Sequence, residues 1–333
     1  RSGKSTQSAG HTVRTVGSST SSAHRPASPG LSPLPVPGND SPHPHGTLTG
    51  SGPAILPTSE QHWITSSHTG RRYRIQTTVT GPAPESGYPV FYTLDGDTLF
   101  AVAAMAAHAL TTRTGENGVE PMLIVGVGYS DGAWLNTDAR VDDYTPPVPD
   151  GSASHDARGR RQGGAGRFLR FLREELQPAM AERFSVNPQR QALFGHSFGG
   201  LFALYTLFNQ PDAFQTYIAS SPSLWWHDEY ILQERDRFVQ AQAGRPLLPV
   251  RVHLSIGEYE QKHAPYIAPD SPRAQMLKAR GQVDRVRAFT RHLNETLPGL
   301  PVSFTEHPRS THGSSQLYAV LDALRFASGT SDA

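Results

Sequence analysis

The stretch Gln191-Ala192-Leu193-Phe194-Gly195-His196-Ser197-Phe198-Gly199-Gly200 is an apolar run that ends in a glycine-rich turn, and the apolar segment 201–205 follows it. This order predicts a strand, a sharp turn with Ser197 at its apex, and a helix. The serine hydroxyl would then project above the edge of the sheet, beside unpaired backbone N–H groups at the helix N-terminus, which favour negative charge. The stretch therefore indicates a site that can stabilise an oxyanion.

A Gly-x-Ser-x-Gly pattern also occurs in turns that only join a strand to a helix and carry an exposed serine. The surrounding sequence decides between these interpretations, because here an apolar strand precedes the turn and helical spacing follows it. We therefore interpret Ser197 as a candidate nucleophile.

Length and composition limit the possible classes of protein. A chain of 333 residues can form one large α/β domain with extra segments, and its formal net charge of +1 gives no general attraction to nucleic acid or acidic membranes. The sequence has no cysteine, which excludes disulfides, thiolate metal sites and a cysteine nucleophile. No apolar run approaches the roughly 20 residues of a membrane-spanning helix.

Residues 1–53 are rich in Ser, Pro, Gly, Thr and His and contain few large apolar side chains. Such a segment cannot bury enough surface to offset the entropy of ordering it, so we expect a disordered tail or linker ahead of a catalytic domain at 54–333. His43-Pro44-His45 lacks further ligands at defined spacing and does not predict a metal site. The tail favours an exported, periplasmic or tethered protein over a cytoplasmic one, while the compartment and the oligomeric state stay open.

Strand and helix patterns alternate along the rest of the chain. Strands are expected at 62–65, 73–79, 88–94, 121–128, 191–196, 216–221, 250–257 and 302–306, the first two as an antiparallel hairpin. Helices are expected at 98–112, 168–176, after Ser197, at 229–242, through 276–293 and at 314–326. This alternation predicts a mostly parallel sheet that helices cover on both faces.

The segment 129–166 follows a central strand and is full of Asp, Pro, Gly and Arg, without a clear periodicity. Loops of this length in compact domains are usually functional or disordered. Ligands bind at the carboxyl ends of the strands in such sheets, so we predict an irregular segment that forms a wall of the substrate site.

A serine hydroxyl needs a base within hydrogen-bonding distance before it can attack a carbonyl group, and histidine is the usual base. A nucleophilic turn of this kind is followed in the chain first by the acid and then by the histidine. His307 and His312 both follow the last predicted strand. We prefer His312, which Gly313 and the closing helix follow, while His307 is nearer to the end of the strand.

The acid should follow the predicted strand that ends at Gly257, where its carboxylate would orient the histidine ring and stabilise the imidazolium. The candidates are Glu258, Glu260, Asp270 and Asp284. We favour Glu260, with Glu258 close behind, and a solvated loop carboxylate is an open alternative for each.

The oxyanion should be bound by the backbone N–H of Phe198 together with that of Gly96 or Asp97, in the turn after the strand 88–94. Asp95-Gly96-Asp97 also resembles the start of a calcium loop. The remaining ligand positions are missing, so no metal site is predicted.

Several segments together resemble the esterase D-like family of α/β-hydrolases, and most of all its siderophore esterases, which open the trilactone of enterobactin and salmochelin. The segments are 88–96, Arg140 with 143–146, 195–200, 221–226 and 311–313, within a resemblance that covers about 55–326. The resemblance implies an α/β-hydrolase fold and ester hydrolysis without a cofactor, with Ser197 as nucleophile and His312 as base. Since some members are described as Ser-His dyads, it leaves the role of Glu260 open.

The resemblance also implies that the partner is a small-molecule ester, such as a ferric siderophore. Arg140 is then expected either to contact an anionic catecholate or to brace its own loop. Trp225 and Trp226 are expected to stack on aryl groups, with core packing of at least one of them as the alternative. The arginines of this region, Arg158, Arg160 and Arg161, fit a solvated charge run better than a substrate contact.

Two other functions remain open at this stage. One is an esterase or thioesterase for another acyl group, of the feruloyl or S-formylglutathione type. The other is a non-catalytic siderophore-binding protein on a hydrolase scaffold, which the presence of both Ser197 and His312 disfavours.

Overall fold

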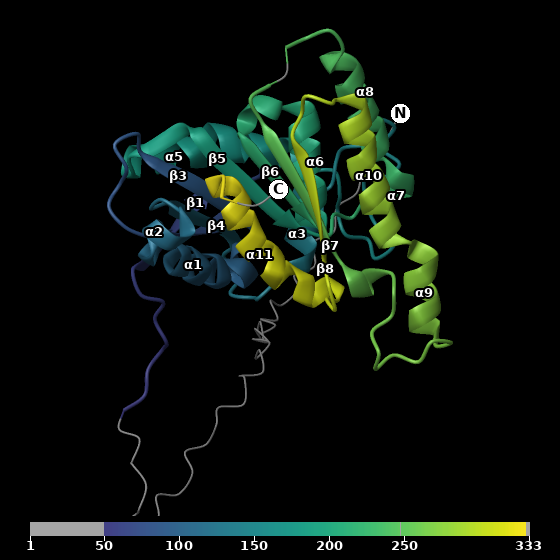
Figure 1. The fold of residues 1–333 in the computed structure, drawn as a ribbon, viewed down its shortest axis with the longest axis horizontal. Helices are drawn as coiled ribbons and strands as arrows, with labels where there is room; N and C mark the ends of the chain where they lie inside the picture. The colour runs from purple at the N-terminus through teal and green to yellow at the C-terminus, as the bar shows by residue number, and fades with distance from the viewer. Residues whose placement is uncertain (1–49, 247, 331–333) are drawn as a thin grey trace, which may run out of the picture. The chain divides into compact units, whose positions relative to one another are not determined.

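Eight strands form one sheet in the order β1-β2-β4-β3-β5-β6-β7-β8 (Figure 1). Their bounds are β1 (Ser59–Thr65), β2 (Arg72–Val79), β3 (Tyr88–Leu94), β4 (Leu123–Tyr129), β5 (Val186–His196), β6 (Thr216–Ser220), β7 (Arg251–Gly257) and β8 (Val302–His307). β1, β2 and β4 pair antiparallel, and all other neighbours pair parallel. The predicted hairpin and the mostly parallel sheet of an α/β-hydrolase are confirmed.

The helices are α1 (Gly96–Thr112), α2 (Thr114–Asn117), α3 (Thr137–Tyr144), α4 (Ala165–Arg170), α5 (Gln177–Arg183), α6 (Phe198–Asn209), α7 (Trp226–Glu229), α8 (Ile231–Gln242), α9 (Pro272–Arg280), α10 (Gln282–Thr296) and α11 (His312–Ser328). A π-helical turn, η1 (Phe171–Leu176), joins α4 to α5, and 3-10 turns lie at η2 (Pro211–Ala213) and η3 (Glu258–Glu260).

This computed structural model describes residues 50–246 and 248–330. The predicted tail at 1–53, with His43-Pro44-His45, therefore lies outside the described residues except for 50–53, which are exposed and without regular structure. From Ala54 onward the chain forms one compact unit.

Helices cover both faces of the sheet. Successive side chains of a strand point to opposite faces, so a strand that is apolar throughout needs a layer of helices on each face. On β3, the Phe91 side chain packs in a cluster with Phe100 of α1 and Val320 of α11. The neighbouring Tyr92 belongs to the larger cluster on the other face, to which α6, α8 and α10 contribute. α1 and α11 thus form one layer, and the remaining large helices form the other (Figure 1).

The segment 129–166 was predicted to be irregular, and this prediction is wrong in part because the segment contains α3. Asn136 caps this helix, and its side-chain oxygen accepts a hydrogen bond from Ala139 N at 2.8 Å. The buried Asp143 carboxylate accepts hydrogen bonds from the hydroxyls of Tyr73 and Tyr129 at 2.8 and 3.0 Å. Polar bonds thus fasten α3 to β2 and β4, beside the few buried apolar side chains Ala139, Val141 and Tyr144, which are too few to give a clear helical spacing in the sequence.

The long helix predicted through 276–293 is two helices. Gly281 separates α9 from α10 in a left-handed conformation, with φ at 56°, which glycine adopts at little cost. The chain therefore changes direction at this residue, next to the carboxyl end of the sheet.

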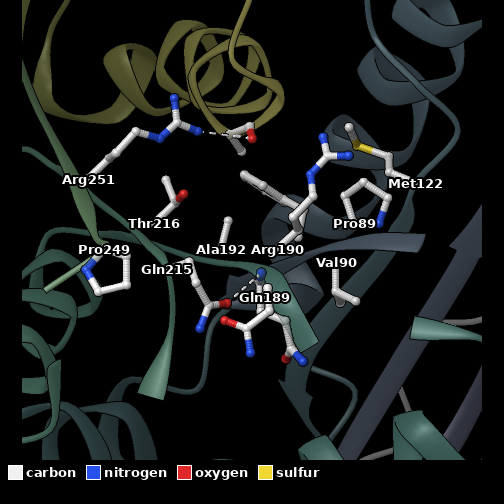
Figure 2. A pocket seen from close by; sticks show the side chains of 13 residues that line it. Pro89, Val90, Met122, Gln189, Arg190, Ala192, Gln215, Thr216, Pro249 and Arg251 are labelled. Carbon is white, nitrogen blue, oxygen red and sulfur yellow. Dashed lines mark hydrogen bonds between the residues drawn. The ribbon is translucent and has the colours of Figure 1, made fainter. Parts of the chain in front are cut away.

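A pocket of about 250 Å³ lies at the edge of the sheet opposite to the carboxyl ends of the parallel strands (Figure 2). Its lining includes the first residues of β3, β6 and β7 and the middle of β5. Its two arginines already have partners within the protein. Arg251 donates to Ala327 O at 3.3 Å, and Arg190 donates to Glu120 at 2.5 Å. Since Ser197 follows the carboxyl end of β5, this pocket is separate from the predicted site.

The turn at Ser197 depends on Gly195. A Cβ atom at Gly195 would lie 2.0 Å from Gly199 O, so we expect Gly195→Ala to lower the free energy of unfolding by about 3 kcal/mol or more. Gly115→Ala in α2 is the control, because no atom lies within 4 Å of its added Cβ, and we expect a change within about 1 kcal/mol. Denaturant unfolding followed by circular dichroism measures both, and equal stabilities of the two variants would contradict the argument.

Candidate active site

Ser197 is the single residue between β5 and α6, with φ at 61° and ψ at −117°. Non-glycine residues rarely adopt positive φ, and such strain persists where the surrounding structure fixes it. Ser197 N donates to Ser220 O at 2.9 Å, and Ser197 O accepts from Leu201 N at 3.0 Å. Both sides of its peptide backbone are therefore held, and the side chain lies at the carboxyl edge of the sheet.

Ser197 Oγ lies 3.0 Å from Nε2 of His312, the first residue of α11. The start of α11 is fixed by a reciprocal cap: Ser314 N donates to Thr311 Oγ1 at 3.3 Å, and Thr311 N donates to Ser314 Oγ at 2.9 Å. The rival candidate His307 is buried instead, with Nδ1 3.6 Å from Asp322 Oδ2. The structure thus brings Ser197 together with His312.

His312 Nδ1 lies 2.7 Å from Oε2 of Glu260. The other oxygen, Oε1, accepts hydrogen bonds from Ser221 Oγ at 2.5 Å, Gly257 N at 3.0 Å and Ser315 Oγ at 3.2 Å. The Glu260 side chain is 3 % exposed, so these donors satisfy and orient a buried carboxylate.

The other acidic candidates lie elsewhere. Glu258 accepts from Arg309 N at 2.7 Å and from Lys262 Nζ at 3.1 Å. Asp284 is exposed and accepts from Gln261 Nε2, and Asp270 is exposed. Of the four predicted carboxylates, Glu260 is the one that contacts His312 in the described part of the chain.

His196 lies directly beside His312. Its ring centroid is 4.7 Å from that of His312, and its Nδ1 is 2.9 Å from Ser220 Oγ. Burial, together with the positive charges of His312 and Arg140, holds the pKa of His196 well below its ordinary value of 6.5. His196 is therefore neutral near pH 7 and adds no positive charge against a protonated His312.

The first residues of α1 and α6 supply free backbone N–H groups at the same edge. Thr98 N and Leu99 N both donate to Asp95 O. Within the described residues, the N–H groups of Gly96, Asp97 and Phe198 have no protein acceptor. The end of β3 packs against α6, since a Cβ atom at Gly199 would lie 3.6 Å from the Leu94 side chain.

The carboxylate of Asp97 is occupied, because it accepts from Arg74 Nε at 2.9 Å and from Tyr129 N at 2.6 Å. Only the backbone N–H of Asp97 is available to a ligand. Gly96 and Asp97 therefore both remain candidate oxyanion donors, together with Phe198.

The Arg140 side chain is buried and braces the site. Its Nε and Nη2 donate to the two carboxylate oxygens of Asp95 at 2.8 Å each, and Nη2 also lies 3.4 Å from His196 O. The guanidinium lies over the rings of Tyr144 and Phe198, 5.3 and 5.6 Å from their centroids. These contacts connect α3 to the turn after β3 and to the turn at Ser197, and leave little of the guanidinium to a substrate.

The two predicted tryptophans differ in exposure. Trp226 is 3 % exposed and packs in the core, so its expected stacking on a substrate is not supported. Trp225 is 41 % exposed, and its ring centroid is 5.9 Å from that of Phe198.

The three arginines that follow α3 are arranged as in a solvated charge run. Arg158 is exposed, Arg160 lies 2.7 Å from Asp156, and Arg161 lies 3.7 Å from Asp142.

Sequence reasoning did not assign roles to three serines around the site. Ser221 and Ser315 hold Glu260, and Ser223 Oγ lies 3.4 Å from Ser197 Oγ. A signal was present, since Ser221 ends a predicted strand, Ser223 follows that strand, and Ser315 is three residues after His312.

The described residues contain no group of three or more His, Asp or Glu side chains placed to bind a metal. No described helix is long and apolar enough to span a membrane.

The family model described as "Putative esterase" matches residues 66–297. The chain belongs to this esterase family. The ferri-bacillibactin esterase BesA of Bacillus subtilis is 34 % identical over 276 residues, which are 82 % of this chain and 90 % of that protein. The siderophore triacetylfusarinine C esterase of Aspergillus fumigatus is 36 % identical over 225 residues, 64 % of this chain and 72 % of that protein.

A solved structure of the siderophore hydrolase EstB from Aspergillus nidulans has a TM-score of 0.72 at 29 % identity, and covers 85 % of this esterase and 99 % of that chain. The predicted family resemblance is confirmed. The protein is an enzyme that hydrolyses esters.

Glu260→Gln keeps the size of the side chain and removes its charge. If the carboxylate orients His312 and stabilises imidazolium, we expect kcat for ester hydrolysis to fall by roughly 10³–10⁴-fold. Glu258→Gln is the matched control, two residues away and without contact to His312, and should change kcat less than twofold. Steady-state kinetics on a chromogenic ester measures both, and an unchanged rate in Glu260→Gln would indicate a working Ser-His dyad.

Proposed function

We propose that this enzyme is a serine esterase that hydrolyses a carboxylic ester of a siderophore through an acyl-enzyme. The observation that carries the proposal is the continuous chain from Ser197 Oγ to His312 and from His312 to Glu260, with distances of 3.0 and 2.7 Å. Nucleophile, base and orienting acid are within hydrogen-bonding distance in the order that such a reaction requires.

In the proposed mechanism, Ser197 Oγ attacks the ester carbonyl carbon while His312 Nε2 takes the hydroxyl proton. The carbonyl oxygen becomes an oxyanion, which the N–H of Phe198 and that of Gly96 or Asp97 stabilise. The bond to the alcohol oxygen then breaks, and His312 returns the proton to that oxygen. Water repeats the sequence on the acyl-enzyme, releasing the acid and restoring Ser197.

Relatives support the siderophore as the substrate class. BesA is named for ferri-bacillibactin, and the Aspergillus fumigatus relative is named for triacetylfusarinine C. We assign an enterobactin-like trilactone to this chain, and the exposed Trp225 ring beside Phe198 fits a substrate that carries aryl groups. A non-catalytic binding protein is disfavoured, since it has no need for a serine and a histidine in hydrogen-bonding contact.

Ser197→Ala tests the nucleophile. We expect kcat to fall by about 10⁵-fold or more, and labelling by a fluorophosphonate to disappear from the intact-mass spectrum. Ser223→Ala is the matched control, because its hydroxyl is 3.4 Å away and it should leave the labelling intact. Turnover or labelling that persists in Ser197→Ala would reject Ser197 as the nucleophile.

The substrate class is tested by product analysis of an enterobactin-like trilactone, iron-free and iron-loaded, beside p-nitrophenyl, feruloyl and S-formylglutathione substrates. We expect chromatography to show ring opening of the trilactone to its linear trimer and smaller esters, with the highest kcat/KM of the panel. A higher kcat/KM for the feruloyl ester or the thioester would assign the enzyme to that class instead.

A further inference from the structure

Three side chains, Phe198, Trp225 and Arg280, are in successive contact, and the first of them belongs to the residue after Ser197. Phe198 is the residue after Ser197, and the centroid of its ring is 5.9 Å from that of Trp225. On Trp225 lies the guanidinium of Arg280, with Cζ 5.7 Å from the ring centroid. The last residue of α9 is thereby brought to the active-site edge.

The loop that carries Trp225 is itself held against the nucleophile. Ser223 N donates to Ser197 O at 3.1 Å. In the next three residues, Leu224 and Trp226 are 1 % and 3 % exposed, whereas Trp225 is 41 % exposed. This loop therefore presents one ring to solvent, and that ring lies against Phe198, the residue after Ser197.

The backbone around Arg280 is also fixed. Its carbonyl oxygen accepts from Arg285 Nε at 2.7 Å, directly before the turn at Gly281. The buried Gln282 then donates from Nε2 to Pro222 O at 3.3 Å, which ties the junction of α9 and α10 to the loop of Trp225. In Figure 1, α9 lies beyond the carboxyl ends of β7 and β8. The fold therefore fixes the backbone from which Arg280 reaches Trp225.

The charge of Arg280 is not neutralised by the protein. α9 has no acidic residue, and in the described ranges no carboxylate lies within ion-pair distance of Arg280. Its neighbours differ, since Arg285 pairs with Glu229 and Arg287 with Glu306. A planar guanidinium on an aromatic face can bind two oxygens of a planar anion while the ring contacts its apolar surface.

We propose that Trp225 and Arg280 form the subsite for an anionic aryl group of the substrate, and that this subsite makes the enzyme prefer iron-loaded over iron-free tricatecholate esters. A catechol gives up both phenolic protons when it binds ferric iron, so the aryl groups of the iron complex carry negative charge, whereas free catechols are neutral near pH 7. The preference rests on the proposed function, while the subsite itself can be tested by binding alone.

The kinetic test compares kcat/KM for an enterobactin-like trilactone with and without iron, and takes the ratio as the preference. We expect Arg280→Ala to lower this ratio about tenfold, chiefly through KM for the iron-loaded ester. Arg280→Lys should lose less, since it keeps the charge but not the planar fork. Lys278→Ala is the control: it removes the same charge from an exposed site of α9, about 200° around the helix. Its ratio should stay within twofold of the wild-type value.

An unchanged ratio in Arg280→Ala, or an equal fall in Lys278→Ala, would overturn the proposed subsite. A second measurement does not depend on hydrolysis: binding of a ferric tris-catecholate complex to Ser197→Ala, followed by tryptophan fluorescence. Arg280→Ala in that background should raise Kd about tenfold, and absent binding or an unchanged Kd would also reject the subsite. A wild-type enzyme that binds the complex through Arg280 but does not open the trilactone would reject only the proposed function.

Discussion

The buried carboxylate of Glu260 is the constraint on which the catalytic edge depends. A carboxylate that is 3 % exposed and lacks partners would cost several kcal/mol, and here it receives hydrogen bonds at both oxygens. The donors come from the segment after β6, the end of β7 and the first turn of α11. Satisfying this one charge therefore brings three distant parts of the chain together, and His312 is placed over Ser197 as a consequence.

A buried ion pair holds the other side of Ser197. Arg140 and Asp95 are 7 % and 6 % exposed and share two hydrogen bonds of 2.8 Å, and Arg140 also reaches His196 O. This pair fixes the turn after β3, where α1 begins, relative to the turn where α6 begins. The N-termini of both helices are therefore fixed relative to each other, and the proposed oxyanion donors belong to these two N-termini.

The elements that sequence alone predicted are those whose signal is local. Continuous apolar runs revealed the central strands, and chain order after their ends selected Ser197, Glu260 and His312 as the candidates. α3 was missed because tertiary polar bonds, such as those to Asp143, stabilise it together with only three buried apolar side chains, which give no clear helical spacing. Trp225 and Trp226 could not be separated for a similar reason, because the exposure of adjacent aromatic residues is decided by packing.

Arg140 and Arg280 show why residue type does not give a role without burial and pairing. Both guanidiniums lie on aromatic rings near Ser197, at 5.6 Å from Phe198 and 5.7 Å from Trp225. The charge of Arg140 is balanced by Asp95 inside the protein, so it is not available to a substrate anion. Arg280 is exposed and has no carboxylate partner in the described chain, so its charge is balanced only by solvent or by what enters the site. A substrate anion that displaces that solvent forms an interaction the free enzyme does not have, and only such an interaction can discriminate between substrates.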